Sequence, residues 1–440
     1  MQTHLAPAFK DTPEGRTAEA VLRQCVHCGF CNATCPTHRL LGDELDGPRG
    51  RIYLMKQVFE GAPVTRLTQE HLDRCIGCRH CETTCPSGVR YSELYEVGTR
   101  VVDAAVPRTP RDRALRWLLR RGLTSPLFKP ALRLGRALRP WLPRPLREAV
   151  PPAPALGAPA WPTAEQQALH TRQVVLLKGC VQPGLRPHID AATARVLDAC
   201  GVRAVVVPGS GCCGAIQAHL GDRDGALERM RRNIDAWWPW MEGQAAGQKG
   251  RAGGKPGVRA EALVLNASGC GAMVKEYAHW LADDPEYAER ARRISAWAQD
   301  LGEWLPQQAA TLQRRLVRKL RPSSARAGGA PLGRITYHPP CSLSHAQQRK
   351  GEVEALLRSL GFDVQLAAND PLQCCGAGGA YNVLHPEIAR GLREEKLRQL
   401  DAEHSAVVAS ANIGCITHLQ SGTRTPVKHW IELVDEALSG

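Results

Sequence analysis

Two runs of closely spaced cysteines near the start of the 440-residue chain have the residue type and spacing of metal ligands. They read Cys25-Val-His-Cys-Gly-Phe-Cys-Asn-Ala-Thr-Cys35-Pro36 and Cys75-Ile-Gly-Cys-Arg-His-Cys-Glu-Thr-Thr-Cys85-Pro86. Each follows the spacing C-x2-C-x2-C-x3-C-P, in which three thiolates on one tight turn reach three irons of a [4Fe–4S] cube. The fourth cysteine precedes a proline that turns the chain away, so we expect it to bind the other cube.

The spacing therefore predicts two [4Fe–4S] clusters that exchange their last ligands. The first cluster set is Cys25, Cys28, Cys31 and Cys85, and the second cluster set is Cys35, Cys75, Cys78 and Cys81. This exchange holds the two cubes as a rigid neighbouring pair, which suits electron transfer. Zinc sites typically use well-separated C-x2-C pairs, and disulfide frameworks are typical of small secreted chains. Neither alternative fits.

The length and composition predict a multidomain globular protein. With 440 residues the chain exceeds one ordinary hydrophobic core, so we expect about two to four domains. The segment Met1–Arg16 is polar and lacks the apolar core of a signal peptide. No run of about 18 apolar residues occurs, so we expect no membrane-spanning helix. These features predict a cytoplasmic protein whose 17 cysteines are reduced.

The positive charge of the chain is concentrated in one connecting segment. Twelve basic and two acidic residues lie between Pro107 and Glu148, so this segment carries most of the formal net charge of +14. A nucleic-acid groove would interleave basic and aromatic residues over one face. The segment offers only Trp117, Phe128 and Trp141, so we expect no nucleic-acid partner.

The residues around the two cysteine runs show helical periodicity. The expected helices are Ala18–Gln24, Arg51–Phe59, Leu67–Arg74 and Tyr91–Val106. They predict an α-helical, ferredoxin-type domain with two [4Fe–4S] clusters over residues 1–106. His27 and His80, inside the runs, are expected to face solvent rather than to donate hydrogen bonds to cluster sulfur.

A basic and then a proline-rich linker is expected over residues 107–170. Arg111–Arg120 predicts an amphipathic helix with Trp117, which would lie either on an anionic membrane surface or on its own protein with its arginines solvated. Crowded prolines are typical of a semi-rigid linker. They are Pro140, Pro143, Pro145, Pro151, Pro152, Pro154, Pro159 and Pro162.

After the linker the order of elements and cysteines occurs twice. The expected strands are Gln173–Leu177, Ala204–Val207 and Ala262–Leu265 in the first repeat, and Arg334–Tyr337, Asp363–Leu366 and Ala406–Ala409 in the second. The helices expected between them are Ala191–Ala199, Val353–Leu360 and Glu387–Leu400. Strands that alternate with helices predict two tandem α/β domains with parallel sheets, over residues 171–325 and 326–440.

Each repeat has four cysteines that follow predicted strands, where open α/β sheets place their sites. The first repeat set is Cys180, Cys212, Cys213 and Cys270, and the second repeat set is Cys341, Cys374, Cys375 and Cys415. Vicinal Cys-Cys-Gly thiolates can bridge neighbouring irons. The alternative is that these cysteines are buried small hydrophobic residues retained from a duplicated ancestor.

The repeats resemble the CCG, or cysteine-rich, domain of heterodisulfide reductases, whose pattern ends in C-x2-C. This chain departs from that pattern, because Met273 follows Cys270 and His418 follows Cys415 at the last cysteine position. Imidazole can replace thiolate on iron. The second repeat set together with His418 therefore predicts a third metal centre, whereas the first repeat set is expected to be vestigial or of unknown role.

The whole order of motifs resembles the iron–sulfur subunit of glycolate oxidase, over nearly the full chain. Related families include the iron–sulfur subunits of anaerobic glycerol-3-phosphate dehydrogenase and of lactate oxidation systems. Only the linker and two Gly-rich basic inserts, near Gly243–Gly257 and Pro322–Gly329, look idiosyncratic. The segments that carry the resemblance are CVHCGFCNATCPTHRLLGDELDGPRGRIYLMKQVFEG, TQEHLDRCIGCRHCETTCPSGVRY, NIDAWWPW, ASGCGAMVKEY, ANIGCITHL and HWIELVDEAL.

The resemblance implies a subunit of an oxidoreductase complex that acts on 2-hydroxy acids, a glycolate dehydrogenase. A flavin-bearing partner would hold FAD and oxidise glycolate to glyoxylate, and this chain would pass the electrons toward a membrane quinone. No catalytic residue is therefore expected here, and no G-x-G-x-x-G follows a predicted strand. The implied location is the cytoplasm, including the inner face of the cell membrane. Two alternatives stay open: an iron–sulfur subunit of a lactate or glycerol-3-phosphate dehydrogenase complex, and a thiol/disulfide reductase at a CCG site.

Overall fold

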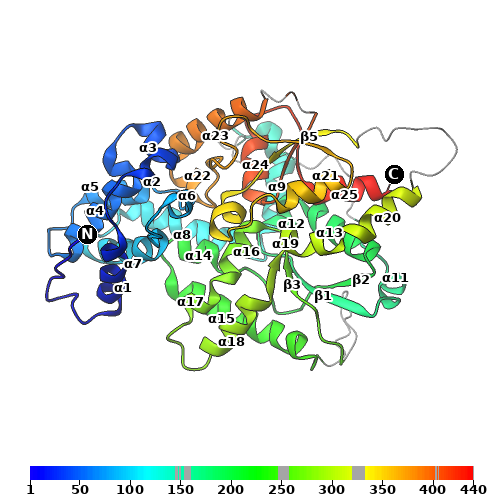
Figure 1. Ribbon diagram of the computed structural model, residues 1–440, viewed down its shortest axis with the longest axis horizontal. Coiled ribbons are helices and arrows are strands. Elements are labelled where there is room, and N and C mark those ends of the chain that lie inside the picture. The colour runs from blue at the N-terminus through cyan, green and yellow to red at the C-terminus, as the bar shows by residue number, and fades with distance from the viewer. Residues whose placement is uncertain are drawn as a thin grey trace.

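The computed structural model has a helical N-terminal region at one end and two α/β units beside it (Figure 1). It describes residues 1–143, 147, 150–152, 160–245, 257–319, 332–401, 404 and 406–439. The predicted insert Pro322–Gly329, most of the insert Gly243–Gly257, and the linker residues Pro145, Pro154 and Pro159 lie outside the described residues. The predicted domain boundary between residues 325 and 326 lies there too, so it stays a prediction.

The N-terminal region is built from short helices, as the sequence predicted. Threonine side chains cap several of them. Thr12 accepts a hydrogen bond from the Gly15 amide at the start of α1, and Thr65 does the same for the Thr68 amide in α5. The helices are α1 (Pro13–Gln24), α2 (Phe30–Thr34), α3 (Pro36–Leu41), η1 (Glu44–Asp46), α4 (Pro48–Phe59), α5 (Arg66–Asp73), α6 (His80–Thr84) and α7 (Tyr91–Ala105). A separate hydrophobic core beneath the cysteine loops includes Leu22, Met55 and Leu94.

The basic segment forms two helices that lead toward the first α/β unit. Thr109 caps the first of them through the Asp112 amide. The two helices are α8 (Pro110–Thr124) and α9 (Phe128–Leu138), and the 3-10 turn η2 (Arg139–Trp141) follows them. A further short helix, α11 (Ala164–Ala168), lies in the rest of the linker.

The first α/β unit has a parallel four-stranded sheet in the order β2-β1-β3-β4. Its strands are β1 (Arg172–Leu177), β2 (Val202–Val205), β3 (Leu263–Leu265) and β4 (Ala298–Asp300). Almost every residue of the central β1 is buried, which is typical of parallel strands covered on both faces. Its helices are α12 (Gln182–Leu185), α13 (Pro187–Ala199), α14 (Ala215–His219), α15 (Arg223–Glu242), α16 (Ser268–Lys275), α17 (Tyr277–Trp280), α18 (Ala288–Trp297), α19 (Leu301–Trp304), η3 (Leu305–Gln308) and α20 (Ala309–Lys319).

The second α/β unit repeats this topology, with the parallel order β6-β5-β7-β8. Its strands are β5 (Arg334–His338), β6 (Asp363–Gln365), β7 (Val408–Ser410) and β8 (Val427–His429). Its helical elements are η4 (Ser342–Ala346), α21 (Glu352–Ser359), α22 (Tyr381–Leu384), α23 (Pro386–Asp401), α24 (Ile413–Gln420) and α25 (Trp430–Ser439). The predicted fold class, an α-helical domain followed by two α/β repeats with parallel sheets, is confirmed.

The strands β4 and β8 were missed by sequence reasoning. Each has three residues, reading Ala-Gln-Asp and Val-Lys-His, and each pairs with a neighbour on one side only. Such short edge strands lack the continuous apolar run that identifies a buried central strand.

The two α/β units share one hydrophobic core. It joins Val174 of β1 and Leu197 of α13 to Tyr337 of β5 and Val434 of α25. In Figure 1 the C-terminal α25 lies beside α13 of the first unit. The two repeats are therefore packed as one body, which fixes the positions of their cysteine sets relative to each other.

Candidate iron–sulfur sites

The first cluster set lies between α1 and α2 and at the end of α6. Cys25 is the C-cap of α1, Cys31 lies on α2, and Cys85 is the C-cap of α6. Gly29 has a φ of 87°, the left-handed conformation that the tight turn after Cys28 requires. All four cysteines line one cavity. The structure thus brings Cys85, sixty residues away on the second run, to the three leading cysteines of the first run.

The thiols of this set oppose one another's ionisation. Burial is the main factor that raises the pKa of Cys31 to about 11, and the neighbouring Cys25 and Cys85 add to the effect. Burial also raises the pKa of Cys25. Such a set is stable as thiolates only with compensating positive charge, which bound metal ions supply. Its chemistry therefore fits an iron–sulfur cluster.

The second cluster set is formed in the reciprocal way. Cys75 and Cys78 follow α5, Cys81 lies on α6, and Cys35 connects α2 to α3. Burial raises the pKa of Cys81 well above its usual value, and the other three thiolates of the set add to this. Burial also raises the pKa of Cys78, and Cys35 and Cys75 of this set add to the effect after Cys341 of the second repeat. Cys35 thus faces the cysteines of the second run, and this set fits a cluster for the same reason as the first.

The first repeat set lies at the carboxyl ends of its strands. Cys180 follows β1, Cys212 and Cys213 follow β2, and Cys270 lies on α16 after β3. Hydrogen bonds between Cys180 and Cys212, between Cys212 and Cys213, and between Cys213 and Cys270 connect all four thiols. Asn233 of α15 holds the vicinal pair in place, because its Nδ2 donates to the Cys212 carbonyl at 2.9 Å.

The second repeat set has the same arrangement. Cys341 Sγ lies 3.8 Å from Cys374 Sγ, and Cys375 hydrogen-bonds with both Cys374 and Cys415. Gly376 has a φ of 90°, and a Cβ there would come within 2.5 Å of the Ala389 carbonyl oxygen, so the Cys-Cys-Gly turn requires glycine. Each repeat therefore gathers four thiols at the edge of a parallel sheet.

Two kinds of comparison bear on these sites. The family model described as "4Fe-4S dicluster domain" matches residues 21–89, and the model described as "Cysteine-rich domain" matches residues 174–275 and 335–420. The chain is 45% identical over 439 residues to the "Glycolate oxidase iron-sulfur subunit" of Escherichia coli (strain K12), covering 100% of this chain and 99% of the relative. The chain belongs to the glycolate oxidase iron–sulfur subunit family.

Two further relatives are more distant. The chain is 27% identical over 441 residues to the "Probable glycolate oxidase iron-sulfur subunit" of Bacillus subtilis (strain 168), with 92% of this chain and 90% of the relative covered. It is 26% identical over 251 residues to "Lactate utilization protein A" of Geobacillus thermodenitrificans (strain NG80-2), covering 56% of this chain. The sequence resemblance to the glycolate oxidase iron–sulfur subunit is thus confirmed. The N-terminal domain of this family member holds two [4Fe–4S] clusters.

Polar groups surround the second cluster set. Tyr91 donates its hydroxyl to Cys75 Sγ at 3.7 Å, and Thr37 Oγ1 lies 3.3 Å from Cys35 Sγ. Arg51 of α4 is 1% exposed and donates from Nε to the His71 carbonyl at 2.7 Å. Burial opposes its charge, but the nearby thiolates hold its pKa above the usual value. The Thr37 hydroxyl donates to the Asp46 carbonyl at 2.9 Å, so the buried Arg51 cation and the Tyr91 hydroxyl are the groups that favour added negative charge at these sulfurs.

The first cluster set is instead close to the molecular surface. Cys28 is exposed, and the flanking side chains Val26 and Phe30 are 67% and 63% exposed. His27, with φ 60°, stacks on Tyr53 at a centroid distance of 6.1 Å. Apolar side chains that stand in solvent beside a redox site are typical of a protein-docking face.

The structure gives His418, the predicted imidazole ligand of a third centre, a different partner. His418 lies on α24, but its Nε2 is 3.1 Å from the Ala389 carbonyl oxygen. The imidazole that joins the thiols is His338, at the end of β5, whose ligand atom lies within 4.8 Å of those of Cys375 and Cys415. Burial lowers the pKa of His338 well below its usual value, so the ring is neutral. The signal that could have identified it is a histidine that ends a buried strand three residues before Cys341.

The helical domain contacts the second repeat set through its second cysteine run. Cys78 is close enough to Cys341 that the Cys341 thiolate, after burial, raises the pKa of Cys78. His80 stacks on His345 of η4 at a centroid distance of 4.1 Å. Thr83 Oγ1 donates to the His80 carbonyl at 3.2 Å and lies 2.8 Å from His345 Nδ1. The expectation that His80 faces solvent was wrong, because the docked second repeat buries it.

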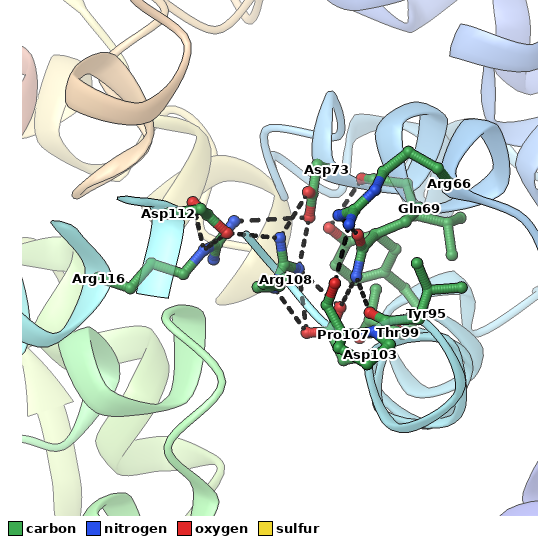
Figure 2. A network of polar contacts seen from close by, with 12 residues as sticks. Arg66, Gln69, Asp73, Tyr95, Thr99, Asp103, Pro107, Arg108, Asp112 and Arg116 are labelled. Atoms are coloured by element: carbon green, nitrogen blue, oxygen red, sulfur yellow. Dashed lines mark hydrogen bonds and ion pairs between the residues drawn. The ribbon is translucent and has the colours of Figure 1, made fainter. Parts of the chain in front are cut away.

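Ion pairs of Arg108 hold the start of the basic segment against the helical domain. Figure 2 shows Arg108 between carboxylates of three helices: Asp73 of α5, Asp103 of α7 and Asp112 of α8. The predicted helix Arg111–Arg120 is found within α8. Its Arg116 also pairs with Asp112, at 3.0 Å, whereas Trp117 and Leu118 are exposed. The helix is therefore docked on its own protein through an arginine, and its contact with a membrane stays a prediction.

Within the described ranges of the chain, no helix combines the length and apolar character needed to cross a bilayer.

Proposed function

We propose that this chain is the electron-transferring subunit of a glycolate-oxidising complex, with partner subunits that carry the flavin chemistry. Its family membership supports this role. The observation that carries it is the order of the cysteine sets: the second cluster set lies between the first cluster set and the second repeat set. Bound [4Fe–4S] clusters supply one-electron carriers.

The chain's own residues give this order a direction. The exposed loop with Val26 and Phe30 offers an input face for the flavin-bearing partner beside the first cluster set. The buried Arg51 and the hydroxyl of Tyr91 stabilise added electrons at the second cluster set. We propose crossed ligation by the two cluster sets as defined above, which keeps these two positions adjacent.

The role is tested with the purified chain alone and with its flavin-bearing partner. Alone, the chain is expected to be brown and redox-active but unable to oxidise glycolate. Glycolate is expected to bleach its visible absorption only after the partner is added. Glycolate-dependent dye reduction by the isolated chain would contradict the proposal, and bleaching by lactate but not glycolate would favour the lactate alternative.

The input face is tested by Phe30→Ser. We expect a several-fold slower glycolate-dependent reduction at limiting partner concentration, with both clusters retained, because docking is weakened. Leu67→Ser is the matched control, since Leu67 is also exposed but lies on α5 and does not line the first cluster set cavity. Equal rates in the two variants would exclude this face.

A third iron centre in the second repeat is part of this proposal. Four thiols, three of them buried, that are linked in sequence by hydrogen bonds have the donor chemistry of such a centre. Iron above about eight per chain, the content of two [4Fe–4S] clusters, that Cys374→Ser removes would support it. Iron that stays near eight would contradict both this centre and the alternative of thiol/disulfide chemistry at a CCG metal site.

We also propose that α8, α9 and η2 contact an anionic membrane surface near a quinone acceptor. Trp117, Leu134 and Trp141 are exposed among the arginines of this segment, and such a mixture favours anionic lipid headgroups. Vesicles with phosphatidylglycerol should bind the chain more strongly than phosphatidylcholine vesicles, and Trp141→Ser should weaken binding. Leu169→Ser, on an equally exposed leucine after α11, should not. Equal binding to both vesicles would refute the contact.

A further inference from the structure

We propose that His338 is a ligand of the metal centre in the second repeat, completing a mixed cysteine–histidine site. The inference rests on the proposed third centre and adds to it a residue outside the family's cysteine pattern. The site then comprises His338 with Cys341, Cys374, Cys375 and Cys415.

His338 is buried without a partner among the described residues. It is 0% exposed at the end of β5, and neither Nδ1 nor Nε2 has a hydrogen-bond partner there. Leaving a buried polar group unpaired costs roughly 1–3 kcal/mol. A bound metal ion would satisfy one of these nitrogens, and this accounts for a histidine where the fold would accept an apolar residue.

The His338 imidazole lies beside two thiols of the second repeat set. One ring nitrogen and the Sγ atoms of Cys375 and Cys415 all lie within 4.8 Å of one another. Ligands of one tetrahedral ion, with metal–sulfur bonds of about 2.3 Å and metal–nitrogen bonds of about 2.0 Å, are about 3.6 Å apart. The observed spacing therefore suits one ion or two adjacent irons of a cluster. A neutral imidazole can replace thiolate on iron.

The first repeat provides an internal comparison. Leu177 ends β1 three residues before Cys180, just as His338 ends β5 three residues before Cys341. Leu177 is buried in the hydrophobic core. The first repeat thus has four thiols but an apolar residue at the imidazole position. We infer that the fifth donor, and the complete site, belong to the second repeat.

The competing candidate is His418, which follows Cys415 at the position of the family's last cysteine. Its Nε2 is engaged by the Ala389 carbonyl, and it is not among the groups close enough to share an ion. The two histidines therefore make a matched pair: both are buried in the second repeat, and only one faces the thiols.

The test uses the full chain, prepared without oxygen and reconstituted with iron and sulfide. Iron per chain and pulsed EPR nitrogen couplings are compared for the parent, His338→Leu, His338→Cys and His418→Gln. We expect His338→Leu to lose the iron above about eight per chain and its signals, with both other clusters kept. His338→Cys should keep this iron but lose the nitrogen coupling, and His418→Gln should keep both.

Two results would overturn the inference in distinguishable ways. If the parent holds iron above about eight per chain and His338→Leu keeps it with an unchanged nitrogen coupling, His338 is not a ligand while the third centre stands. If the parent itself holds only about eight, the third centre fails and the role of His338 fails with it. Retention of the signals of the two other clusters in each variant excludes misfolding as the cause.

Discussion

Single hydroxyl groups near the second cluster set are expected to tune its reduction potential. Tyr91 donates to Cys75 Sγ at 3.7 Å and is buried. Hydrogen bonds to cluster ligands favour the more negative, reduced state. Tyr91→Phe should therefore lower the potential of the cluster bound there by tens of millivolts while the fold is kept.

Its matched control is the neighbouring tyrosine. Tyr95 stacks near Tyr91 at a centroid distance of 5.8 Å, but its hydroxyl donates to the Leu72 carbonyl at 3.0 Å. Potentials from a redox titration followed by EPR should shift in Tyr91→Phe and stay near the parent value in Tyr95→Phe. Equal shifts would mean that the hydroxyl at Cys75 has no specific role.

A buried carboxyl in the first α/β unit is expected to make stability depend on pH. Asp190 of α13 accepts hydrogen bonds on Oδ1 from Gln182 and Asn266, at 2.8 and 3.0 Å, while Oδ2 has no partner among the described residues. Burial raises its pKa from 3.8 to about 6. The folded state then holds this proton more tightly than the unfolded state, so its contribution to stability falls as pH rises from about 4 to about 6.

Asp190→Asn removes the ionisation but keeps the Oδ1 acceptor. It should stabilise the protein at pH 7.5 by about 1–3 kcal/mol and leave stability near pH 4 unchanged, as measured by chemical denaturation. Asp300→Asn is the contrasting variant. Asp300 also has a pKa of about 6 because of burial, but Gln347 donates to its Oδ2 at 3.1 Å, so an amide there would face a donor. Stabilisation by both variants would contradict the hydrogen-bond argument.

At the scale of elements, one arginine joins three helices at the start of the basic segment. Arg108 is 13% exposed and contacts Asp73 at 2.7 Å, Asp103 at 2.7 Å and Asp112 at 3.2 Å (Figure 2). Removing it takes the shared cation from three carboxylates, of which Asp73 and Asp112 keep Arg116 as a partner. Because a broken, largely buried ion pair typically costs about 3–5 kcal/mol, Arg108→Met should lower the free energy of unfolding by about 3 kcal/mol.

Two other variants define this effect. Arg108→Lys keeps the charge but not the paired hydrogen bonds, so we expect an intermediate loss. Arg111→Met, at an exposed position of α8, should change stability by less than about 0.5 kcal/mol. Equal denaturation midpoints for Arg108→Met and Arg111→Met would show that the junction contributes nothing.

At the scale of the whole molecule, the helical domain is held against the first α/β unit by charges. Glu96 of α7 lies 3.2 Å from Arg223 of α15 and 3.4 Å from His279 of α17. The hydrogen bond to Glu96 is the main cause that raises the pKa of His279. The stabilisation is therefore fully present below the usual histidine pKa of about 6.5 and is lost as pH rises through the higher value in the folded protein.

Because His279 is partly exposed, the contribution should be small, about 0.5 kcal/mol. Hydrogen exchange in α7 and α17 should become faster between pH 6 and pH 8.5 beyond the intrinsic pH effect. His279→Gln should show this faster exchange already at pH 6, relative to the parent. An identical pH response of parent and variant would exclude this pair as a determinant of docking.

The local patterns of the sequence determined much of this protein. The cysteine spacings predicted two clusters, because three of the four expected ligands of each cube lie on one tight turn. Apolar periodicity located the helices Arg51–Phe59 and Tyr91–Val106 to within a few residues of α4 and α7. The repeated order of strands and cysteines predicted two α/β units. The cysteine and helix signals lie within short windows, where the spacing of residues along the chain determines their arrangement in space.

The tertiary structure alone decided what depends on contacts between distant segments. The packing of η4 against the second cysteine run buries His80 and brings Cys78 to Cys341. The end of β5 places His338 rather than His418 beside Cys375, because a strand end and a helix face point in directions that sequence spacing does not encode. The edge strands β4 and β8 exist only because a neighbouring strand supplies their hydrogen bonds.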